Sequence, residues 1–358
     1  MGSYFFSNFE TKELNEKTTE KSLIFNESKI TCLLTLKDGR LASSNRSGKL
    51  NIYNETLSQI DLSIKHESSI NSFIQLHNEN LVICSGSIMK IVQLKNKKKY
   101  TIIQTIIIEG ISDLHSFKVI ETKKNELITI YSFFILHHKQ LTVWRLNKKQ
   151  NYEIHCQIKG EQLENILKLN KNEFVVYENI PIMTTNSRVH YEQLVFRDLK
   201  KYNKVATIGE FSHESINGNN FLFLENMCLL SNDLLFFAES LKNVYVIKIS
   251  THEKISKYLT YEGQLSLITK LDNNVIFIIG RIEVKKEERY GKYHLKDGVY
   301  KNYISLYRYN NEEFVEILDE DNNLLSYDGE ICTLGIKYKK DLIACSYYDK
   351  IKLIKIKI

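Results

Sequence analysis

Residues 36–54 read LKDGRLASSNRSGKLNIYN. The stretch passes from a turn into a short apolar run, turns again, and enters a second apolar run. Short runs rich in Leu, Ile and Tyr, bounded by Gly, Asn, Asp and Ser, are typical of strands joined by tight turns. The stretch therefore predicts a pair of antiparallel strands. The fold as a whole depends on whether the same pattern recurs along the chain.

It does recur. ITCLLTLKDGRLASSNRSGKLNIYN, from Ile30, aligns with INSFIQLHNENLVICSGSIMKIVQL from Ile70 and with ICTLGIKYKKDLIACSYYDKIKLIKI from Ile331. Each copy has three apolar runs separated by two polar turns. A further copy must lie between Ile216 and Ile249, where two assignments of the inner strands, FLFLENMCLLSN and CLLSNDLLFFAES, both fit. Looser copies with longer turns begin at Ile111, Leu163 and Leu265.

A fourth apolar run lies between successive copies, for example SQIDLSI, YTIIQTIII and YEIHCQI. Helical periodicity is almost absent. Four antiparallel strands repeated seven times predict an all-β fold, a seven-bladed β-propeller. We name the strands of a blade a to d from the centre outwards. The last copy lacks strand d, and KSLIFN at 21–26 precedes the first copy, so we expect this segment to complete the last blade and close the ring.

This interpretation divides the chain into an N-terminal extension and one domain. The extension covers 1–20 and the propeller covers 21–358, with the insertion of blade 6 at 281–302. The expected closing strand and blades 1 to 7 cover, in order, 21–26, 30–64, 70–108, 111–158, 163–211, 216–261, 264–318 and 331–358.

Several motifs point to a known family. QLTVWRL at 140–146 resembles the third strand of a WD40 repeat and carries the single Trp of the chain. The turn aspartate of that family is matched by Asp349, and its loop histidine by His66 and His213. No copy clearly has both the histidine and the aspartate. The chain is therefore similar to a divergent, WD40-like propeller.

The composition of the chain limits the kinds of partner and the cellular setting that we expect. Lys and Arg number 49 against 43 Asp and Glu, a net charge of +6 that does not by itself indicate nucleic-acid binding. No apolar stretch approaches the about 18 residues of a membrane span, and no apolar leader is visible, so we expect an intracellular, cytoplasmic protein, with the nucleus left open. The six cysteines form no C-x-x-C pair, and we expect buried, reduced thiols.

No nucleophile elbow, phosphate-binding loop or zinc-protease motif occurs. The adjacent pair His137 and His138 has no evident third ligand, so we expect no metal and no cofactor. An enzyme with carboxylates at the central channel, such as Glu225 or Asp113, stays a third candidate. We predict that the protein is not an enzyme.

The order of the strands predicts two different faces. In a meander, the b–c and d–a loops lie on one face, and the a–b and c–d loops lie on the other. Blades 3, 4 and 6 carry insertions in their b–c loops, which marks one face for partner binding, although neutral growth of tolerated loops would look the same. We expect the blade 6 insertion to form a hairpin turning near Gly291. The candidate partner-binding residues are Tyr290, Tyr293, His294, His137, His138 and Arg188.

The a–b and c–d loops, on the face opposite the insertions, are rich in lysine. The d–a loops, on the insertion face, hold acidic residues that include Glu67 and Glu214. The two faces are therefore predicted to carry opposite charge. The leading hypothesis is a monomeric, non-catalytic scaffold that binds protein partners within a larger complex. The alternative is docking on anionic lipid or RNA; a purely compositional origin of the lysines also stays open. The candidate lysines are Lys97, Lys98, Lys99, Lys123, Lys124, Lys148, Lys149, Lys200 and Lys201.

Overall fold

A computed structural model of the chain describes most of the repeat region. The described residues are 22–24, 28–108, 114–133, 139–160, 163–183, 188–214, 227–238, 243–260, 264–272, 275–285, 299–310, 313–317, 332–339, 342–347 and 350–355. Within these ranges all regular structure is β-strand, and no helix is long and apolar enough to cross a membrane.

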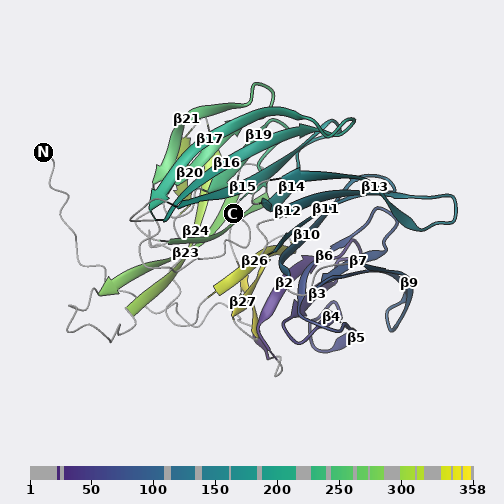
Figure 1. Cartoon of the computed structure of the whole chain (residues 1–358). Helices are drawn as coiled ribbons and strands as arrows, with labels where there is room; N and C mark the ends of the chain where they lie inside the picture. The colour runs from purple at the N-terminus through teal and green to yellow at the C-terminus, as the bar shows by residue number, and fades with distance from the viewer. Residues whose placement is uncertain are drawn as a thin grey trace, which may run out of the picture.

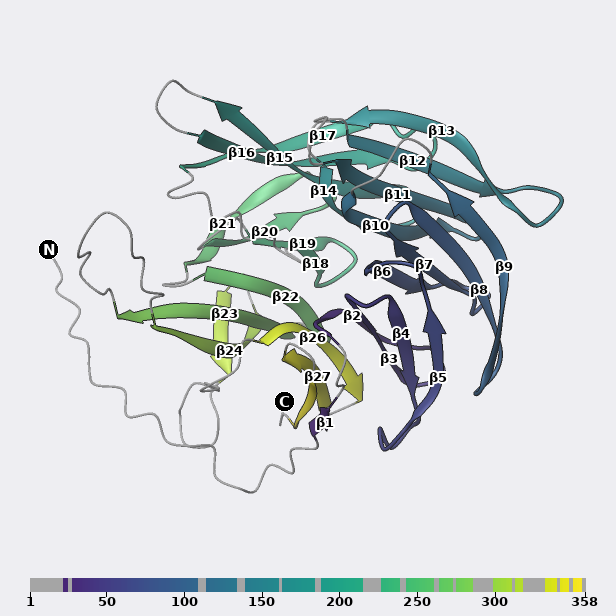
Figure 2. The same cartoon turned by 60° about the horizontal axis from the view of Figure 1, so that its bottom comes forward.

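The strands form seven antiparallel sheets of four strands each, arranged around a ring (Figures 1 and 2). This confirms the predicted seven-bladed β-propeller. Blade 1 contains β2 (Ile30–Thr35), β3 (Leu41–Asn45), β4 (Lys49–Tyr53) and β5 (Ile60–Lys65). Blade 2 contains β6 (Ile70–Gln75), β7 (Leu81–Ser85), β8 (Ile88–Asn96) and β9 (Lys99–Ile107). Blade 3 contains β10 (Leu114–Lys123), β11 (Glu126–Phe133), β12 (Lys139–Leu146) and β13 (Tyr152–Gly160).

The other blades follow the same plan. Blade 4 contains β14 (Leu163–Lys168), β15 (Glu173–Met183), β16 (Arg188–Asp198) and β17 (Lys204–Glu214). Blade 5 contains β18 (Met227–Leu229), β19 (Leu234–Ala238), β20 (Asn243–Lys248) and β21 (Glu253–Thr260). Blade 6 contains β22 (Gln264–Asp272), β23 (Val275–Lys285), β24 (Val299–Asn310) and β25 (Glu313–Ile317). Blade 7 contains β26 (Cys332–Lys339), β27 (Leu342–Tyr347), β28 (Lys350–Lys355) and β1 (Ser22–Ile24).

The ring closes as the sequence predicts. β1 pairs antiparallel with β28, with Ser22 opposite Lys352 and Ile24 opposite Lys350. The last sheet therefore runs β1-β28-β27-β26 and pairs the first described strand with the last one; β1 lies close to the C-terminal end in Figure 2. Pairing satisfies the backbone groups of β28 that would otherwise form an open edge.

Blade 5 decides between the two assignments that the sequence left open. Its inner strand among the described residues is β18, and β19 covers the buried run Leu235–Phe237. Pairing of Cys228 with Phe236 fixes this register. The second assignment, CLLSNDLLFFAES, is the one observed, because it places the most apolar run in the well-covered second strand rather than beside the channel.

The core lies between blades rather than within them. Six apolar clusters each join neighbouring blades, and one of them spans blades 6, 7 and 1 across the closure. Trp144 packs between blades 2 and 3 in the same cluster as the fully buried Phe117. Burial of one such side chain stabilises the fold by about 1.5–3 kcal/mol, so each junction contributes substantially. Cys84 and Cys345 are buried within this core and are not part of a disulfide.

Candidate interaction face

Contacts between neighbouring turns show which turns share a face. The Nζ of Lys37, in the a–b turn of blade 1, donates to the carbonyl oxygen of His77 in the a–b turn of blade 2 at 3.0 Å. The Nζ of Lys123, at the end of β10, donates to the carbonyl oxygen of Leu199 in the c–d turn of blade 4 at 2.7 Å. The a–b and c–d turns therefore lie together, as the meander predicts. We call this side of the ring the lysine face.

Lysines near the inner edge of the lysine face are used within the fold. Like Lys37 and Lys123, Lys270 donates to a carbonyl oxygen of the neighbouring blade 5, and Lys339 donates to one of blade 1. An ammonium shared with a backbone carbonyl ties two blades together and satisfies an acceptor at a strand end. Lys123 was among the lysines predicted to meet an anionic surface, and its ammonium also makes this internal contact.

Side chains at the ends of the inner strands strengthen the same ring. Gln75, the last residue of β6, accepts the backbone N–H of Lys37 through Oε1 at 2.7 Å. In the next blade, Glu121 accepts the N–H of His77 through Oε2 at 2.8 Å, and the same oxygen lies 2.6 Å from the His77 Nδ1. Each contact joins one blade to the turn of the blade before it, so this part of the lysine face is held in a fixed arrangement.

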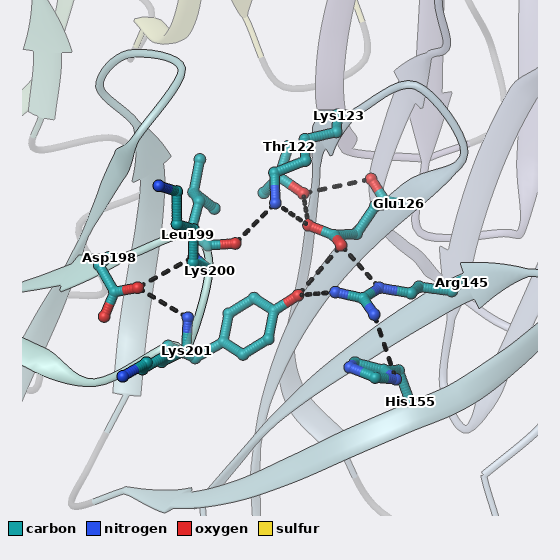
Figure 3. Close-up of polar contacts among 10 residues, drawn as sticks. Thr122, Lys123, Glu126, Arg145, His155, Asp198, Leu199, Lys200 and Lys201 are labelled. Carbon is teal, nitrogen blue, oxygen red and sulfur yellow. Dashed lines mark hydrogen bonds and ion pairs between the residues drawn. The ribbon is translucent and has the colours of Figure 1, made fainter.

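A buried carboxylate locks blades 3 and 4 together (Figure 3). Glu126, at the start of β11, is 4% exposed. It accepts hydrogen bonds from Thr122 Oγ1 at 2.8 Å, from Arg145 Nε at 2.9 Å and from the Tyr202 hydroxyl at 3.0 Å. Tyr202 belongs to the c–d turn of blade 4, so the carboxylate connects two blades. We call Glu126, Thr122, Arg145 and Tyr202 the carboxylate lock.

The electrostatics of the carboxylate lock describe a structural contact. Burial alone would raise the pKa of Glu126, but hydrogen bonds from Arg145, Thr122 and Tyr202 outweigh it and hold that pKa below its ordinary value. Burial and the adjacent Glu126 charge raise the pKa of Tyr202 to about 12. Glu126 is therefore ionised and Tyr202 neutral at neutral pH. With every group engaged, this cluster holds no proton acceptor free for substrate.

The c–d turn of blade 4 presents two lysines from a pinned backbone. The Asp198 Oδ1 accepts the N–H groups of Lys200 at 2.9 Å and Lys201 at 2.7 Å, as Figure 3 shows, and Oδ2 accepts that of Asn203 at 3.1 Å. Burial alone would raise the pKa of Asp198, but these backbone donors lower it below its ordinary value. A short carboxylate at the first turn position favours this arrangement. The backbone is fixed while both lysine side chains extend into solvent.

A side-chain acceptor also fixes the backbone of the c–d turn in the two preceding blades. In blade 3, the Asn147 Oδ1 accepts the N–H groups of Lys149 at 2.8 Å and Asn151 at 3.0 Å. In blade 2, the Asn96 Oδ1 accepts the N–H of Lys98 at 2.9 Å. We call the exposed lysines of these three turns the lysine tips: Lys97, Lys98, Lys148, Lys149, Lys200 and Lys201.

The lysine tips have few partners within the described residues. Lys97 lies 3.3 Å from Glu55, but both side chains are about two-thirds exposed, at 68% and 66%. Such a surface pair contributes about 0–1 kcal/mol and is easily exchanged for another partner. The ammonium groups of the other tips make no hydrogen bond or ion pair with any described residue, and neither do those of the exposed Lys99 and Lys124. Positive charge is thus available across three consecutive blades.

One polar hollow opens on the lysine face between blades 1 and 2. It has a volume of about 370 Å³, and its lining includes Arg40, Glu79, Lys95 and Lys97. The Arg40 guanidinium is paired with Asp38, at 2.8 Å from Nε to Oδ2. Both signs of charge are present, so the hollow favours neither anions nor cations. Among the residues that the structure describes, no group of three His, Cys, Asp or Glu side chains is placed to hold a metal ion.

The opposite face carries the hairpins of blades 4 and 6. β15 and β16 stay paired to Met183 and Arg188, and β23 and β24 stay paired to Lys285 and Val299. Both pairs extend beyond their neighbours in Figure 2. Most of the blade 4 insertion is therefore strand rather than loop, and Arg188 lies at its end. The other partner-binding candidates, Tyr290, Tyr293, His294, His137 and His138, fall outside the described residues.

The predicted acidity of this opposite face is only partly described. Glu67 is exposed, but its carboxylate lies 2.7 Å from Nζ of Lys90, which balances its charge. The preceding His66 is buried and accepts the N–H of Glu67 through Nδ1 at 3.1 Å, a backbone contact rather than a catalytic one. Burial, followed by the nearby Lys90 charge, lowers the pKa of His66 to about 4. Most other acidic d–a residues lie outside the described ranges, so the difference in charge between faces stays a prediction.

Sequence reasoning missed the carboxylate lock, whose members lie far apart along the chain. It treated all lysines of the face alike. The sequence does hold a signal for the lysine tips, because NKKK, NKKQN and DLKKYN each place Asn or Asp one or two residues before a Lys pair. That pattern is typical of a turn with a side-chain acceptor at its first position.

Comparison with models of known protein families gives no match for the chain, and comparison with curated proteins gives no match either. The arrangement of the sheets by itself establishes a seven-bladed propeller.

Proposed function

We propose that this propeller is a non-catalytic scaffold that binds an acidic protein partner through its lysine face, as one subunit of a larger complex. The observation that carries the proposal is the repetition of the lysine tips in blades 2, 3 and 4, each on a backbone pinned by Asn or Asp. A rigid turn loses little conformational freedom on binding. Exposed charge of one sign favours rapid association with a complementary surface.

The non-catalytic part of the proposal is supported by the state of the titratable groups. The most buried carboxylate of the lysine face, Glu126, accepts three hydrogen bonds, and Glu121 is joined to the turn of blade 2. A general base needs a free acceptor within reach of a substrate proton. Glu126 accepts through both of its oxygens, and Glu121 uses its Oε2 in the contact with His77.

Kinship with WD40 repeats is also part of the proposal. Trp144, on strand c of blade 3, is buried and donates from Nε1 to the Thr129 hydroxyl on strand b at 2.9 Å. In blade 1 the Tyr53 hydroxyl, again on strand c, lies 2.8 Å from the Ser43 hydroxyl on strand b. This recurring contact supports descent of the blades from one repeat. A reducing, cytoplasmic setting fits the free thiols of the described blades.

Affinity capture from cell extract, followed by mass spectrometry, tests the scaffold function. The informative variant is Lys148→Glu combined with Lys149→Glu, both at one lysine tip. Lys65→Glu is the control, because Lys65 is exposed at the far end of β5, away from the lysine face. We expect the tip variant to lose at least one partner that the wild-type protein and the control retain. An identical partner list for all three would contradict the proposal.

Binding to anionic lipid or RNA is the second candidate, and the exposed ammonium groups of the lysine tips favour it. A phosphate-binding surface loses affinity steeply as salt is added, because binding releases counterions. Sedimentation with phosphatidylserine vesicles and anisotropy with single-stranded RNA measure the two cases. Tight, salt-sensitive binding that Lys148→Glu/Lys149→Glu abolishes would favour this candidate over the protein scaffold.

A further inference from the structure

The outer strands of blades 1 to 4 share an irregularity. In blade 2, Ile91 pairs with Gln104 while the next residue, Val92, pairs with Ile102, so Ile103 is an extra residue in strand d. The same β-bulge occurs at the equivalent point of the other three blades. A bulge increases twist and turns side chains outward at a sheet edge. The four extra residues are Asp61, Ile103, His155 and Val205.

Exposed aliphatic side chains gather at this one position. Among the described residues, the large apolar side chains with high exposure are Ile60 at 44%, Ile102 at 42%, Ile103 at 41%, Ile107 at 66%, Ile154 at 53% and Val205 at 49%. All except Ile107 are either the bulge residue or the residue directly before it. We call Ile60, Ile102, Ile103, Ile154 and Val205 the rim arc.

The rim arc is unlike an ordinary protein surface. Single exposed aliphatic residues scattered over a surface are common and need no explanation. Sheet edges that only avoid aggregation use charged side chains or proline at such points. Here an exposed isoleucine or valine occupies the bulge position or the position directly before it in four consecutive blades. That repetition indicates a surface that a partner covers.

Positive charge borders the rim arc. Each c–d turn leads directly into strand d, so the lysine tips lie just before the aliphatic residues of the same blade. Lys148 and Lys149 precede Ile154, and Lys200 and Lys201 precede Val205. In blade 1, Asp61 is largely buried and lies 3.9 Å from Arg40, so its charge is balanced inside the protein. A ligand that follows the rim from blade 2 to blade 4 meets cations and aliphatic groups in alternation.

The shape of the ring selects the kind of ligand. The outer strands β5, β9 and β13 follow the convex outside of the propeller (Figure 2). A flat membrane touches a convex rim at one place, whereas a flexible chain can follow it across several blades. Single-stranded RNA is flexible too, but it binds chiefly by stacking bases on aromatic or arginine side chains. The exposed members of the rim arc are all isoleucine or valine. An extended polypeptide matches both the curvature and the chemistry.

We infer that the rim arc and the lysine tips together bind an extended acidic segment of a partner protein, in which aliphatic or aromatic residues alternate with Asp and Glu. The acidic side chains meet the lysine tips, and the apolar side chains cover the rim arc. This inference rests on the proposed scaffold function and defines the chemistry of the partner.

Fluorescence anisotropy with two synthetic peptides tests the inference on the full-length protein. The first probe alternates Asp or Glu with Leu or Phe; the second is oligo-glutamate of equal length and net charge. The rim variant is Ile102→Ser/Ile103→Ser, and its matched control is Ile107→Ser, an exposed isoleucine of the same strand outside the rim arc. All three residues are exposed, so thermal melting should stay at the wild-type value.

We expect the rim variant to bind the acidic–apolar peptide at least about five-fold more weakly than wild type, because apolar burial is lost. Its affinity for oligo-glutamate should stay within about two-fold, since the lysine tips are intact. Ile107→Ser should match wild type with both peptides. Lys148→Glu/Lys149→Glu should weaken the binding of both peptides, and Lys65→Glu should weaken the binding of neither.

Two results would overturn the inference: unchanged binding of the acidic–apolar peptide by the rim variant, or binding of oligo-glutamate, oligo-uridine RNA or phosphatidylserine vesicles as tightly as that peptide. Affinity capture separates the two levels of the argument. If the rim variant keeps every partner that the lysine-tip variant loses, the rim arc is not the site and the scaffold function stands. If wild-type protein captures no partner, the scaffold function itself fails.

Discussion

Replacing Glu126 with alanine should weaken the polar contact between blades 3 and 4 while leaving the side chains of the apolar cluster between them unchanged. The substitution removes the acceptor of three hydrogen bonds, from Thr122, Arg145 and Tyr202. Tyr202 is 4% exposed, so its hydroxyl would lose a charged acceptor in a buried site. Arg145 has a side chain that is 43% exposed, and water replaces much of what it loses.

The size of the effect follows from these burials. A hydrogen bond to a charged group contributes about 1.5–3 kcal/mol, and removal of one member of a buried ionic network costs about 3–5 kcal/mol. Because the Arg145 contribution is reduced by solvent, we expect Glu126→Ala to lower the free energy of unfolding by about 3 kcal/mol. Glu126→Gln keeps the shape and one acceptor, and should cost about half as much. Glu55→Gln, at an exposed carboxylate, is the control and should cost less than about 0.5 kcal/mol.

Urea denaturation followed by circular dichroism measures these differences, and their pH dependence gives a second check. The pKa of Glu126 is lowered in the folded state. The stability that it contributes is therefore complete above the ordinary carboxyl pKa and is lost as the pH falls through the lowered folded value. The advantage of wild type over Glu126→Gln should shrink in that acid range. A cost below about 1 kcal/mol for Glu126→Ala at neutral pH would refute the carboxylate lock.

Three further changes probe closure, packing and the opposite face. Deleting residues 1–27 removes β1, leaves β28 as an open edge, and should give a markedly lower melting temperature with aggregation in size-exclusion chromatography; an unchanged monomer would contradict the closure. Gly335→Ala would place Cβ 2.5 Å from Cε1 of the fully buried Phe277, and we expect the free energy of unfolding to fall by about 1–3 kcal/mol. Wild-type stability of this variant would contradict the close packing. Replacing 282–302 with a short Asn-Gly turn should leave the propeller folded but remove a partner from affinity capture, and an unchanged partner list would favour neutral growth of the insertion.

Much of the architecture follows from local signals in the chain. Short apolar runs between turn residues predict the strands, and the missing last strand together with 21–26 predicts the closure that β1 and β28 make. The position of Trp144 between blades also follows, because a large apolar residue in a repeated strand must pack against a neighbour. In blade 5 the local signals fitted two registers. The choice depended on which apolar run is buried on both sides, a property of packing.

The carboxylate lock, the rim arc and the lysine tips depend on contacts that the periodicity of the sequence does not encode. Glu126 and Tyr202 are 76 residues apart, and their contact requires the relative placement of two blades. The bulges that create the rim arc come from single extra residues, such as Ile103, which break the alternation used to read a strand. A count of lysines cannot separate Lys123, which bonds to a carbonyl, from Lys148 and Lys149, which face solvent. Only the three-dimensional arrangement separates structural cations from those available to a partner.

Zero-length cross-linking tests the central claim most directly. A carbodiimide joins a lysine ammonium to a carboxylate only when the two are in contact, and mass spectrometry then identifies the lysine. Applied to the complex captured with wild-type protein, the account predicts cross-links from partner Asp or Glu residues to the lysine tips, above all Lys148, Lys149, Lys200 and Lys201. Cross-links confined to Lys65 and other lysines away from the lysine face, with the tips unmodified, would contradict it.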